Sequence, residues 1–283
     1  MISFYIIAYL VFYTVFTCGY RELARKLKRP AALTILVELM AGSFVLVFIP
    51  FFELKAATDL RTYFMLFTAC IFYSISDRIN TIVRANVEAS FFSVLRQINT
   101  VIMIAAGFLI QDAPFQWNKI IGAAFIIGSN ILVFYQKGSL KVNKYLLYGI
   151  ISGLASCAAQ LIDINASSEF NLAIYISMSL LTPAMIIMTT ERIRPAEVIA
   201  EFKHGDRRIM LITALASSAS PLLLLLCYTS GDLTIVAPLC SLTVFLTIIV
   251  SCIFLGEKNE LKKKFFSGLL VIIGIIIINR KGE

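Results

Sequence analysis

The stretch that decides the fold is APLCSLTVFLTIIVSCIFLGEKNELKKKFFSGLLVIIGIIII, which runs from Ala237 to Ile278. It holds two apolar runs, separated by a turn with Glu257 and by three lysines at 262–264. A helix needs ~20 apolar residues to cross the hydrocarbon core of a bilayer. The runs are continuous rather than alternating, which excludes a closed β-barrel. The stretch therefore predicts two membrane-spanning helices joined by a short basic loop, whose three lysines are expected to anchor the second helix at anionic lipid headgroups.

The rest of the chain is also rich in apolar residues and poor in charged ones. Of its 283 residues, 59% are hydrophobic and only 15% are charged, whereas soluble domains are about a quarter charged. The mean hydropathy is +0.86, which indicates that lipid covers the outer surface. The first apolar run lacks the basic start and the cleavage site of a signal peptide, so we interpret it as a retained helix. Ten hydrophobic segments are expected, at 2–19, 31–52, 62–83, 88–110, 118–135, 145–164, 170–190, 208–228, 233–255 and 265–279.

An internal repeat relates the two halves of the chain. The stretch ASFFSVLRQINTVIMIAAGFLIQDAPFQWNKIIGAAFIIGSNILVF, which begins at Ala89, follows the same pattern as the segment that begins at Thr234. Each copy has an apolar run, an acidic turn, a polar stretch and a second run with two glycines. The turns (Asp112 and Glu257) are 145 positions apart. The glycine pairs, 146 positions apart, are Gly122 with Gly128 and Gly268 with Gly274.

The repeat sets the expected architecture. Five helices per copy is an odd number, so two consecutive copies must have opposite orientations in the membrane. We therefore predict an all-α membrane protein with ten transmembrane helices, arranged as two inverted five-helix repeats at 1–138 and 139–283. Inverted repeats are typical of secondary transporters, whose substrate site lies near the midplane between the halves.

The net charge of +8 belongs to the loops. Nineteen of the 25 Lys and Arg residues follow the odd-numbered segments, which places those loops in the cytoplasm and both termini outside. Their number includes Arg84, which follows the third segment, and Arg78, which lies late in that segment and is counted with the same loop. Because no separate basic arm or domain is present, nucleic acid is not an expected partner. The six cysteines lie in hydrophobic runs without a CxxC spacing, and with a single histidine they predict neither a metal site nor a cofactor.

The repeat and its glycines resemble the drug/metabolite transporter superfamily, specifically its EamA-type ten-helix members. Leu255, Gly256 and Glu257, together with Gly268 and Gly274, carry the resemblance. The first half departs from the pattern, because Asp112 stands where Glu is usual. The resemblance implies a transporter or exporter of small organic solutes with a central cavity and with cytoplasmic termini. That orientation conflicts with the charge count, and both stay open.

Charged residues inside the apolar segments are the first candidates for the site. A charge deep in a membrane costs ~2.5–3.5 kcal/mol on insertion scales, so it normally faces a cavity or a partner. Glu38 lies about two turns into the second segment, and Arg96 lies at a similar depth in the fourth. They are either ligands for substrate or protons, or a buried ion pair that holds two helices together.

Further candidates share helix faces with these charges. Tyr73, Asp77 and Asn80 have the spacing i, i+4, i+7, although Asp77 could instead pair with Arg78 at the interface. Tyr9 and Tyr13 belong to an aromatic stripe that either binds an organic cation or simply packs. The remaining candidates are Asn99, which follows Arg96, and the group Ser156, Gln160 and Asp163, of which Asp163 is expected at the membrane surface.

The function that these features favour is secondary transport of a small metabolite by alternating access. Arg96 would meet a carboxylate and Glu38 an ammonium group, which favours an amino acid or an organic amine, with protons as a candidate coupling ion. The expected partners are the solute and the lipid bilayer of a bacterial inner membrane, for a monomer or a homodimer. No Walker A loop is present, and an enzyme is not expected. The alternatives are a non-transporting subunit or scaffold and, with less support, a membrane-embedded lipid enzyme.

Overall fold

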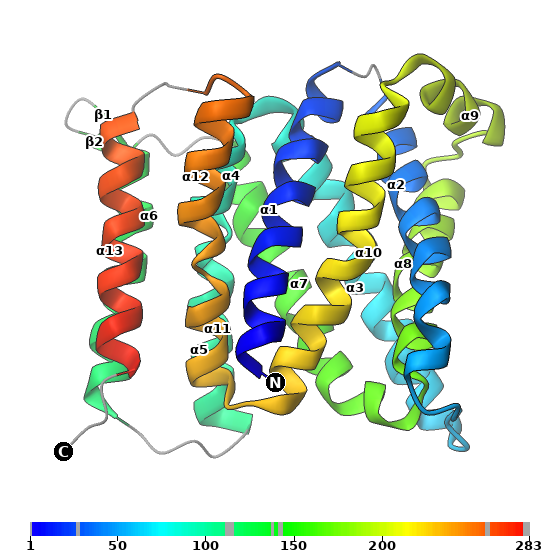
Figure 1. The fold of residues 1–283 in the computed structure, drawn as a ribbon, viewed down its shortest axis with the longest axis horizontal. Helices are drawn as coiled ribbons and strands as arrows, with labels where there is room; N and C mark the ends of the chain where they lie inside the picture. The colour runs from blue at the N-terminus through cyan, green and yellow to red at the C-terminus, as the bar shows by residue number, and fades with distance from the viewer. Residues whose placement is uncertain are drawn as a thin grey trace.

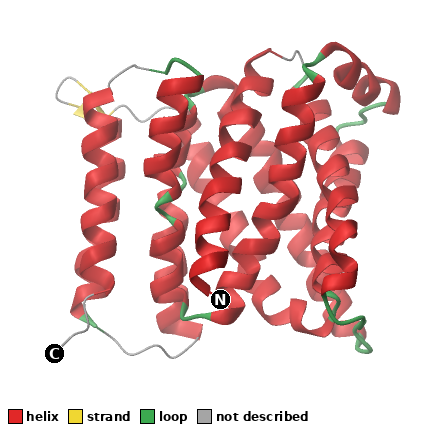
Figure 2. Ribbon diagram, viewed as in Figure 1, coloured by secondary structure: helices red, strands yellow, loops and turns green. Residues whose placement is uncertain are grey.

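The computed structural model is an all-α bundle (Figures 1 and 2). It describes residues 2–26, 29–110, 116–136, 139–140, 144–257 and 261–279. Asp112 and the loop lysines Lys28, Lys137, Lys141 and Lys258 lie outside the described residues. The strands β1 (Tyr135–Gln136) and β2 (Ser139–Leu140) form a two-residue antiparallel ladder at one end of the bundle.

Each expected hydrophobic segment coincides with helix. The first half contains α1 (Ile2–Lys26), α2 (Pro30–Val45) with the 3-10 turn η1 (Leu46–Phe51), α3 (Leu60–Asn86), α4 (Ala89–Leu95), α5 (Gln97–Ile110) and α6 (Trp117–Phe134). The second half contains α7 (Lys144–Ala166) with η2 (Ser167–Glu169), α8 (Leu172–Thr190), α9 (Pro195–His204), α10 (Arg207–Ser230), α11 (Leu233–Cys240), α12 (Thr243–Phe254) and α13 (Leu261–Asn279).

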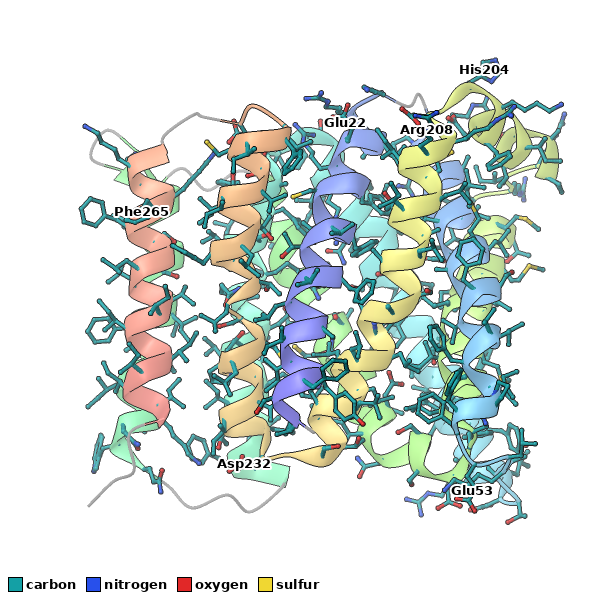
Figure 3. All side chains as sticks on the ribbon, viewed as in Figure 1. Glu22, Glu53, His204, Arg208, Asp232 and Phe265 are labelled. Atoms are coloured by element: carbon teal, nitrogen blue, oxygen red, sulfur yellow. The ribbon has the colours of Figure 1, made fainter. Side chains whose placement is uncertain are left out.

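The surface of the bundle is apolar along its length. Seven helical stretches among the described residues are long and apolar enough to cross a membrane. Large hydrophobic side chains of the bundle point outward: Phe4 on α1 is 69% exposed and Phe64 on α3 is 70% exposed. Phe265 likewise points away from α13 (Figure 3). Because monomeric soluble proteins rarely expose such continuous apolar surface, the chain is an integral membrane protein.

The helix ends follow local sequence signals. Pro30 and Pro195 stand in the first turns of α2 and α9, where a missing N–H costs nothing. Asp206 and Asp232 accept hydrogen bonds from the first backbone N–H groups of α10 and α11. Asn171 caps α8 and also donates to three carbonyls in and after η1, which ties the two halves together at this end.

Two expectations about basic residues are wrong. Arg84 lies inside α3 and is buried, because α3 runs three residues further than the apolar segment predicts. Lys264 is 4% exposed and forms an ion pair with Glu88, so it does not serve as a lipid anchor.

Candidate functional site

A polar cavity of about 190 Å³ lies inside the bundle. Helices α1, α2, α3, α4, α5, α7, α8, α10 and α11 and the start of α12 contribute to its wall, whereas no described residue of α6 or α13 does. The structure brings together the eight side chains singled out from the sequence, and all of them line this cavity: Tyr9, Tyr13, Glu38, Tyr73, Asp77, Arg96, Asn99 and Gln160. Their roles in binding stay predictions.

Two interrupted helices meet at the cavity. Arg96 separates α4 from α5, and Ser241 and Leu242 separate α11 from α12. Pro238 lacks an N–H and so weakens α11 near its end, where the Ser241 hydroxyl donates to the Pro238 carbonyl at 2.6 Å. Arg96 and Ser241, which lie at the breaks 145 positions apart, both line the cavity.

Glu38 brings a carboxyl group into an apolar helix wall. Its side chain is 5% exposed, and neither carboxyl oxygen has a hydrogen-bond partner among the described residues. The alternative of a buried ion pair with Arg96 is wrong, because no described residue pairs with either Glu38 oxygen and Arg96 Nη2 donates to Ser156 Oγ at 3.2 Å. A buried carboxylate without a partner is costly, so a cationic group or a proton in the cavity would complete this site.

Asp77 and Arg78 point to different sides of α3. Asp77 lines the cavity, whereas Arg78 forms an ion pair with Glu191, the residue that follows α8. The alternative of an Asp77–Arg78 pair at the interface is therefore wrong. Two consecutive residues on a helix face different directions, so only one of the pair can share the face of Tyr73 and Asn80.

Asp163 is buried rather than at the membrane surface, which corrects the prediction. It is 3% exposed and accepts hydrogen bonds from the hydroxyl groups of Tyr73 at 2.5 Å and Tyr175 at 2.7 Å. These bonds join α7 to α3 and α8 and satisfy both carboxylate oxygens. No group of three or more His, Cys, Asp or Glu side chains among the described residues is placed to hold a metal ion.

The wall around Arg96 is rich in amide and hydroxyl groups. Ser156 Oγ accepts a second hydrogen bond, from Gln160 Nε2 at 3.2 Å, which holds the two side chains on one face of α7. Arg96 Nη1 and Asn99 Oδ1 are buried without a partner in the described part of the chain. This wall therefore offers one free donor and one free acceptor.

An aromatic row on α1 forms another wall. Tyr9 and Tyr13 have ring centroids 5.3 Å apart, and the row continues through Phe16 to Tyr20. All four rings line the cavity, whereas Phe12 is 40% exposed on the outer surface. The stripe seen in the sequence therefore divides into cavity residues and residues that face outward.

Arg84 is the cavity residue that sequence reasoning missed. Its guanidinium carbon lies 4.4 Å from the ring centroid of Phe16, 4.8 Å from that of Tyr20 and 4.5 Å from that of Phe92. Arg84 continues the face of Tyr73, Asp77 and Asn80 at i+11, which is the signal that could have identified it.

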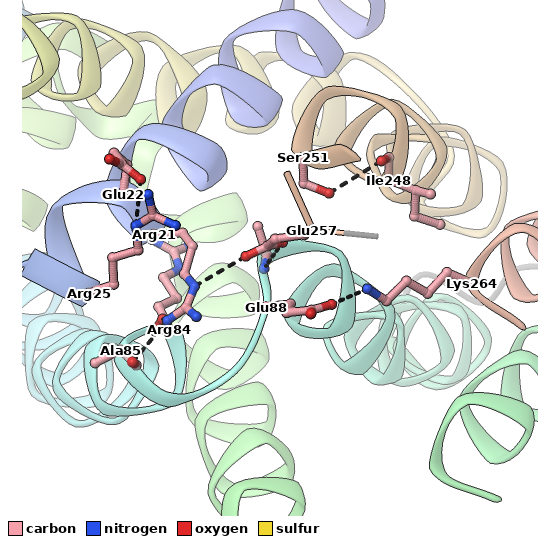
Figure 4. A network of polar contacts seen from close by, with 11 residues as sticks. Arg21, Glu22, Arg25, Arg84, Ala85, Glu88, Ile248, Ser251, Glu257 and Lys264 are labelled. Carbon is pink, nitrogen blue, oxygen red and sulfur yellow. Dashed lines mark hydrogen bonds and ion pairs between the residues drawn. The ribbon is translucent and has the colours of Figure 1, made fainter. Parts of the chain in front are cut away.

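A polar network closes the bundle beyond Arg84 (Figure 4). Arg21 Nη1 donates to the carbonyls of Arg84 at 2.6 Å and Ala85 at 2.8 Å, and its Nε donates to Glu257 Oε1 at 3.3 Å. The other Glu257 oxygen accepts from the Ala89 N–H at 2.8 Å, at the start of α4. The network therefore joins α1, α3, α4 and the turn after α12.

Gly256 explains why the Leu-Gly-Glu turn has this sequence. Its φ of 67° lies in the left-handed region that favours glycine. The turn lets the Glu257 N–H donate to the Ser251 carbonyl at 3.2 Å and brings the carboxylate beneath α4. Burial raises the pKa of the Glu257 carboxyl above its ordinary value of 4.5, and the nearby Glu88 adds to this effect while Arg21 opposes it.

The comparisons with known proteins show a shared fold. No protein-family model matches the chain, and no curated protein matches it. A solved structure described as "Crystal structure of protein" has a TM-score of 0.60 and 10% sequence identity, and the match covers 96% of this chain and 96% of that one. At that identity the likeness shows a shared fold alone.

Proposed function

We propose that this protein is a secondary transporter of the drug/metabolite transporter type. It moves a small organic solute, an amino acid or an organic amine, across a bacterial inner membrane by alternating access through the central cavity. The observation that carries the proposal is the Glu38 carboxyl group, which lines the cavity and has no hydrogen-bond partner among the described residues. An ammonium group is a cation that would pair with this carboxyl group.

Helix packing supports ten transmembrane helices in two inverted repeats, 1–138 and 139–283. The first helix of each half packs on the third helix of the other, since α1 contacts α10 and α7 contacts α3. The second helices, α2 and α8, contact each other, as do the fifth helices, α6 and α13. In Figure 1 α6 runs toward the end that carries β1, whereas α13 runs toward the C-terminus at the opposite end. If each helix is replaced by its equivalent in the other half, the same set of contacts results.

Two ion pairs support the same relation at residue level. Lys264, near the start of α13, pairs with Glu88, which precedes α4. Lys119, near the start of α6, pairs with Asp232, which precedes α11, at 3.8 Å. The lysines are 145 positions apart and the acids are 144 apart. Each half therefore contributes one lysine and one acid to an equivalent pair.

The interrupted helices support a transport site. Many secondary transporters bind substrate near the midplane, at discontinuous helices whose freed backbone groups line a cavity. The breaks at Arg96 and Ser241 are at equivalent positions of the two repeats, and both face the cavity.

The chemistry of the wall favours a substrate with an amino group. Aromatic faces attract cations, and Tyr9 and Tyr13 line the cavity together with Glu38. Two guanidinium groups, those of Arg84 and Arg96, offer a site for a carboxylate. Glu38 is also the candidate carrier if transport is coupled to protons.

Alternating access requires that each end of the cavity opens in turn. The network of Arg21, Glu257 and the α4 N-terminus closes the end of the bundle that carries α9. In the proposed cycle these bonds break when the cavity opens to that side.

Uptake into proteoliposomes tests the proposal. Radiolabelled amino acids and amines are offered to vesicles that contain the wild type, Glu38→Gln or the control Glu53→Gln, whose side chain is 80% exposed. We expect uptake of at least one solute by the wild type and the control, and its loss in Glu38→Gln. Absence of uptake and of exchange for every solute would favour a non-transporting subunit or scaffold.

A further inference from the structure

Arg84 is a buried cation for which the described part of the chain supplies no acceptor. The residue is 5% exposed, and its Nε has no hydrogen-bond partner among the described residues. No carboxylate of a described residue forms an ion pair with it. A guanidinium group keeps its charge and has five N–H donors in a fixed planar fork. Three aromatic rings hold the group, but aromatic faces supply no acceptor in the plane of that fork.

Arg84 differs in this respect from Arg96, the other guanidinium of the cavity. Arg96 already donates to Ser156 at 3.2 Å. No hydrogen bond from the Arg84 guanidinium to a described residue is present, although the group lines the cavity. A planar fork with free donors matches a carboxylate, which can accept two parallel hydrogen bonds. Arg84 is therefore the better placed of the two for a carboxylate.

A cluster of hydroxyl groups lies between Arg84 and Glu38 on the cavity wall. The Tyr20 hydroxyl lies 2.6 Å from Thr81 Oγ1 on α3, and Thr34 Oγ1 on α2 donates to the same Thr81 atom at 2.7 Å. Glu38 is four residues after Thr34, and Arg84 is three residues after Thr81. Because α2 and α3 run in opposite directions, the two charged residues lie on opposite sides of this cluster, each roughly one helical turn, ~5 Å, from it along its own helix. A substrate that contacts both charges would therefore lie across the cluster.

The charges on the cavity wall restrict which kind of anion can bind. The cavity has three carboxyl groups, those of Glu38, Asp77 and Asp163, against the two guanidinium groups. The excess of carboxyl groups would repel a phosphate dianion. A zwitterion instead brings a negative charge for a guanidinium group and a positive charge for a carboxyl group. A carboxylate accompanied by an ammonium group fits both open positions.

We propose that Arg84 is the residue that binds the carboxylate of a zwitterionic substrate, while Glu38 holds its ammonium group. This inference rests on the proposed function and narrows it from amines in general to amino acids. Arg84 then sets specificity, because it gives affinity only to ligands that carry the carboxylate.

Binding of matched ligands to the detergent-purified full chain tests the proposal. Each amino acid of a panel is compared with its methyl ester and with the amine that lacks the carboxylate. We expect the wild type to bind one amino acid at least tenfold more tightly than its ester or amine. Arg84→Met, which keeps an apolar side chain among the rings, should reduce that ratio to about one and still bind the amine. Arg84→Lys keeps the charge without the fork and should give an intermediate ratio.

The outcomes separate this inference from the proposed function. If the wild type binds neither amines nor amino acids, the proposed function fails and the inference fails with it. If amines bind and the ratio is near one in the wild type, or stays high in Arg84→Met, the inference alone is overturned. Collapse of the ratio in Arg96→Met but not in Arg84→Met would also overturn it. Binding of acetate alone, equal in strength to that of the amino acid, would assign Arg84 to free anions instead.

Discussion

At the scale of residues, two buried carboxyl groups of the cavity have opposite surroundings. Asp163 is satisfied by the hydroxyl groups of Tyr73 and Tyr175, whereas Glu38 has no hydrogen-bond partner among the described residues. Leaving a buried polar group unsatisfied costs about as much as a hydrogen bond gains, or more. The fixed partners of Asp163 therefore fit a role in stability, and the unsatisfied carboxyl of Glu38 supports the role in binding that we propose for it.

Removal of one hydroxyl tests the structural role of Asp163. Tyr175→Phe leaves Asp163 Oδ1 without its donor and should lower the stability of the detergent-solubilised protein by about 1 kcal/mol. The measurement is a thermal melt followed by intrinsic fluorescence. Tyr63→Phe is the control, because Tyr63 is 39% exposed and makes a ring contact that phenylalanine retains. Equal melting temperatures for the two variants would contradict the role assigned to Asp163.

At the scale of elements, α6 and α13 approach each other through glycine. A Cβ atom at Gly122 would lie 2.5 Å from the Gly274 carbonyl oxygen, and one at Gly274 would lie 2.7 Å from the Gly122 carbonyl oxygen. Both distances are shorter than the contacts that Cβ atoms make in real structures. The two glycines therefore allow the backbones to make direct contact, as small residues do between membrane helices.

A pair of alanine substitutions tests this contact. Gly122→Ala should destabilise the protein by ~1–3 kcal/mol, because α6 and α13 must separate to admit the methyl group. Gly128→Ala has no atom within 4 Å of its new Cβ and should be neutral, or stabilising by ~0.5–1 kcal/mol through helix propensity. Thermal melts of both variants make the comparison. Similar losses at the two positions would contradict the packing.

The turn after α12 predicts a pH dependence. Because burial raises the pKa of Glu257, the folded state holds its proton more firmly than the unfolded state does. Stability from this group is therefore present below pH 4.5 and is lost as pH rises through the elevated pKa. We expect the melting temperature of Glu257→Gln, relative to the wild type, to increase across that window. A difference that stays constant from pH 4 to 7 would contradict the burial of this carboxyl.

At the scale of the whole molecule, charge distinguishes the two ends of the bundle. Arg208 and His204 lie at one end with Glu22, whereas Glu53 and Asp232 lie at the other (Figure 3). The helix α9, with Lys203 in its last turn, belongs to the first end. Lysine and arginine in short loops favour the cytoplasmic side, so the end with α9 is expected to face the cytoplasm.

Reporter fusions test this orientation. Alkaline phosphatase fused to the C-terminus should be active, because the charge distribution places that terminus outside the cytoplasm. A fluorescent protein fused at the same position should stay dark when it is exported unfolded. The opposite pair of results would show cytoplasmic termini, as the family resemblance implies.

The helices and much of the cavity could be predicted from the sequence. Hydrophobic runs predict helices because lipid requires a continuous apolar surface, and buried charges such as Glu38 and Arg96 stand out within them. The burial of Arg84 does not follow from the sequence, because the apolar run ends one residue before it and burial there depends on rings from α1 and α4. The partners of Asp163 come from two other helices, which no local pattern reveals.

Glu38 is the residue that we propose binds the cationic part of the substrate. The most direct test is the melting temperature of the purified protein against ligands sorted by charge, for the wild type and Glu38→Gln. A ligand at 100 times its Kd stabilises the folded state by ~2.7 kcal/mol. We predict that a zwitterion or amine raises the melting temperature of the wild type and that Glu38→Gln abolishes the shift. A shift that survives unchanged in Glu38→Gln, or no shift with any ligand, would contradict the account.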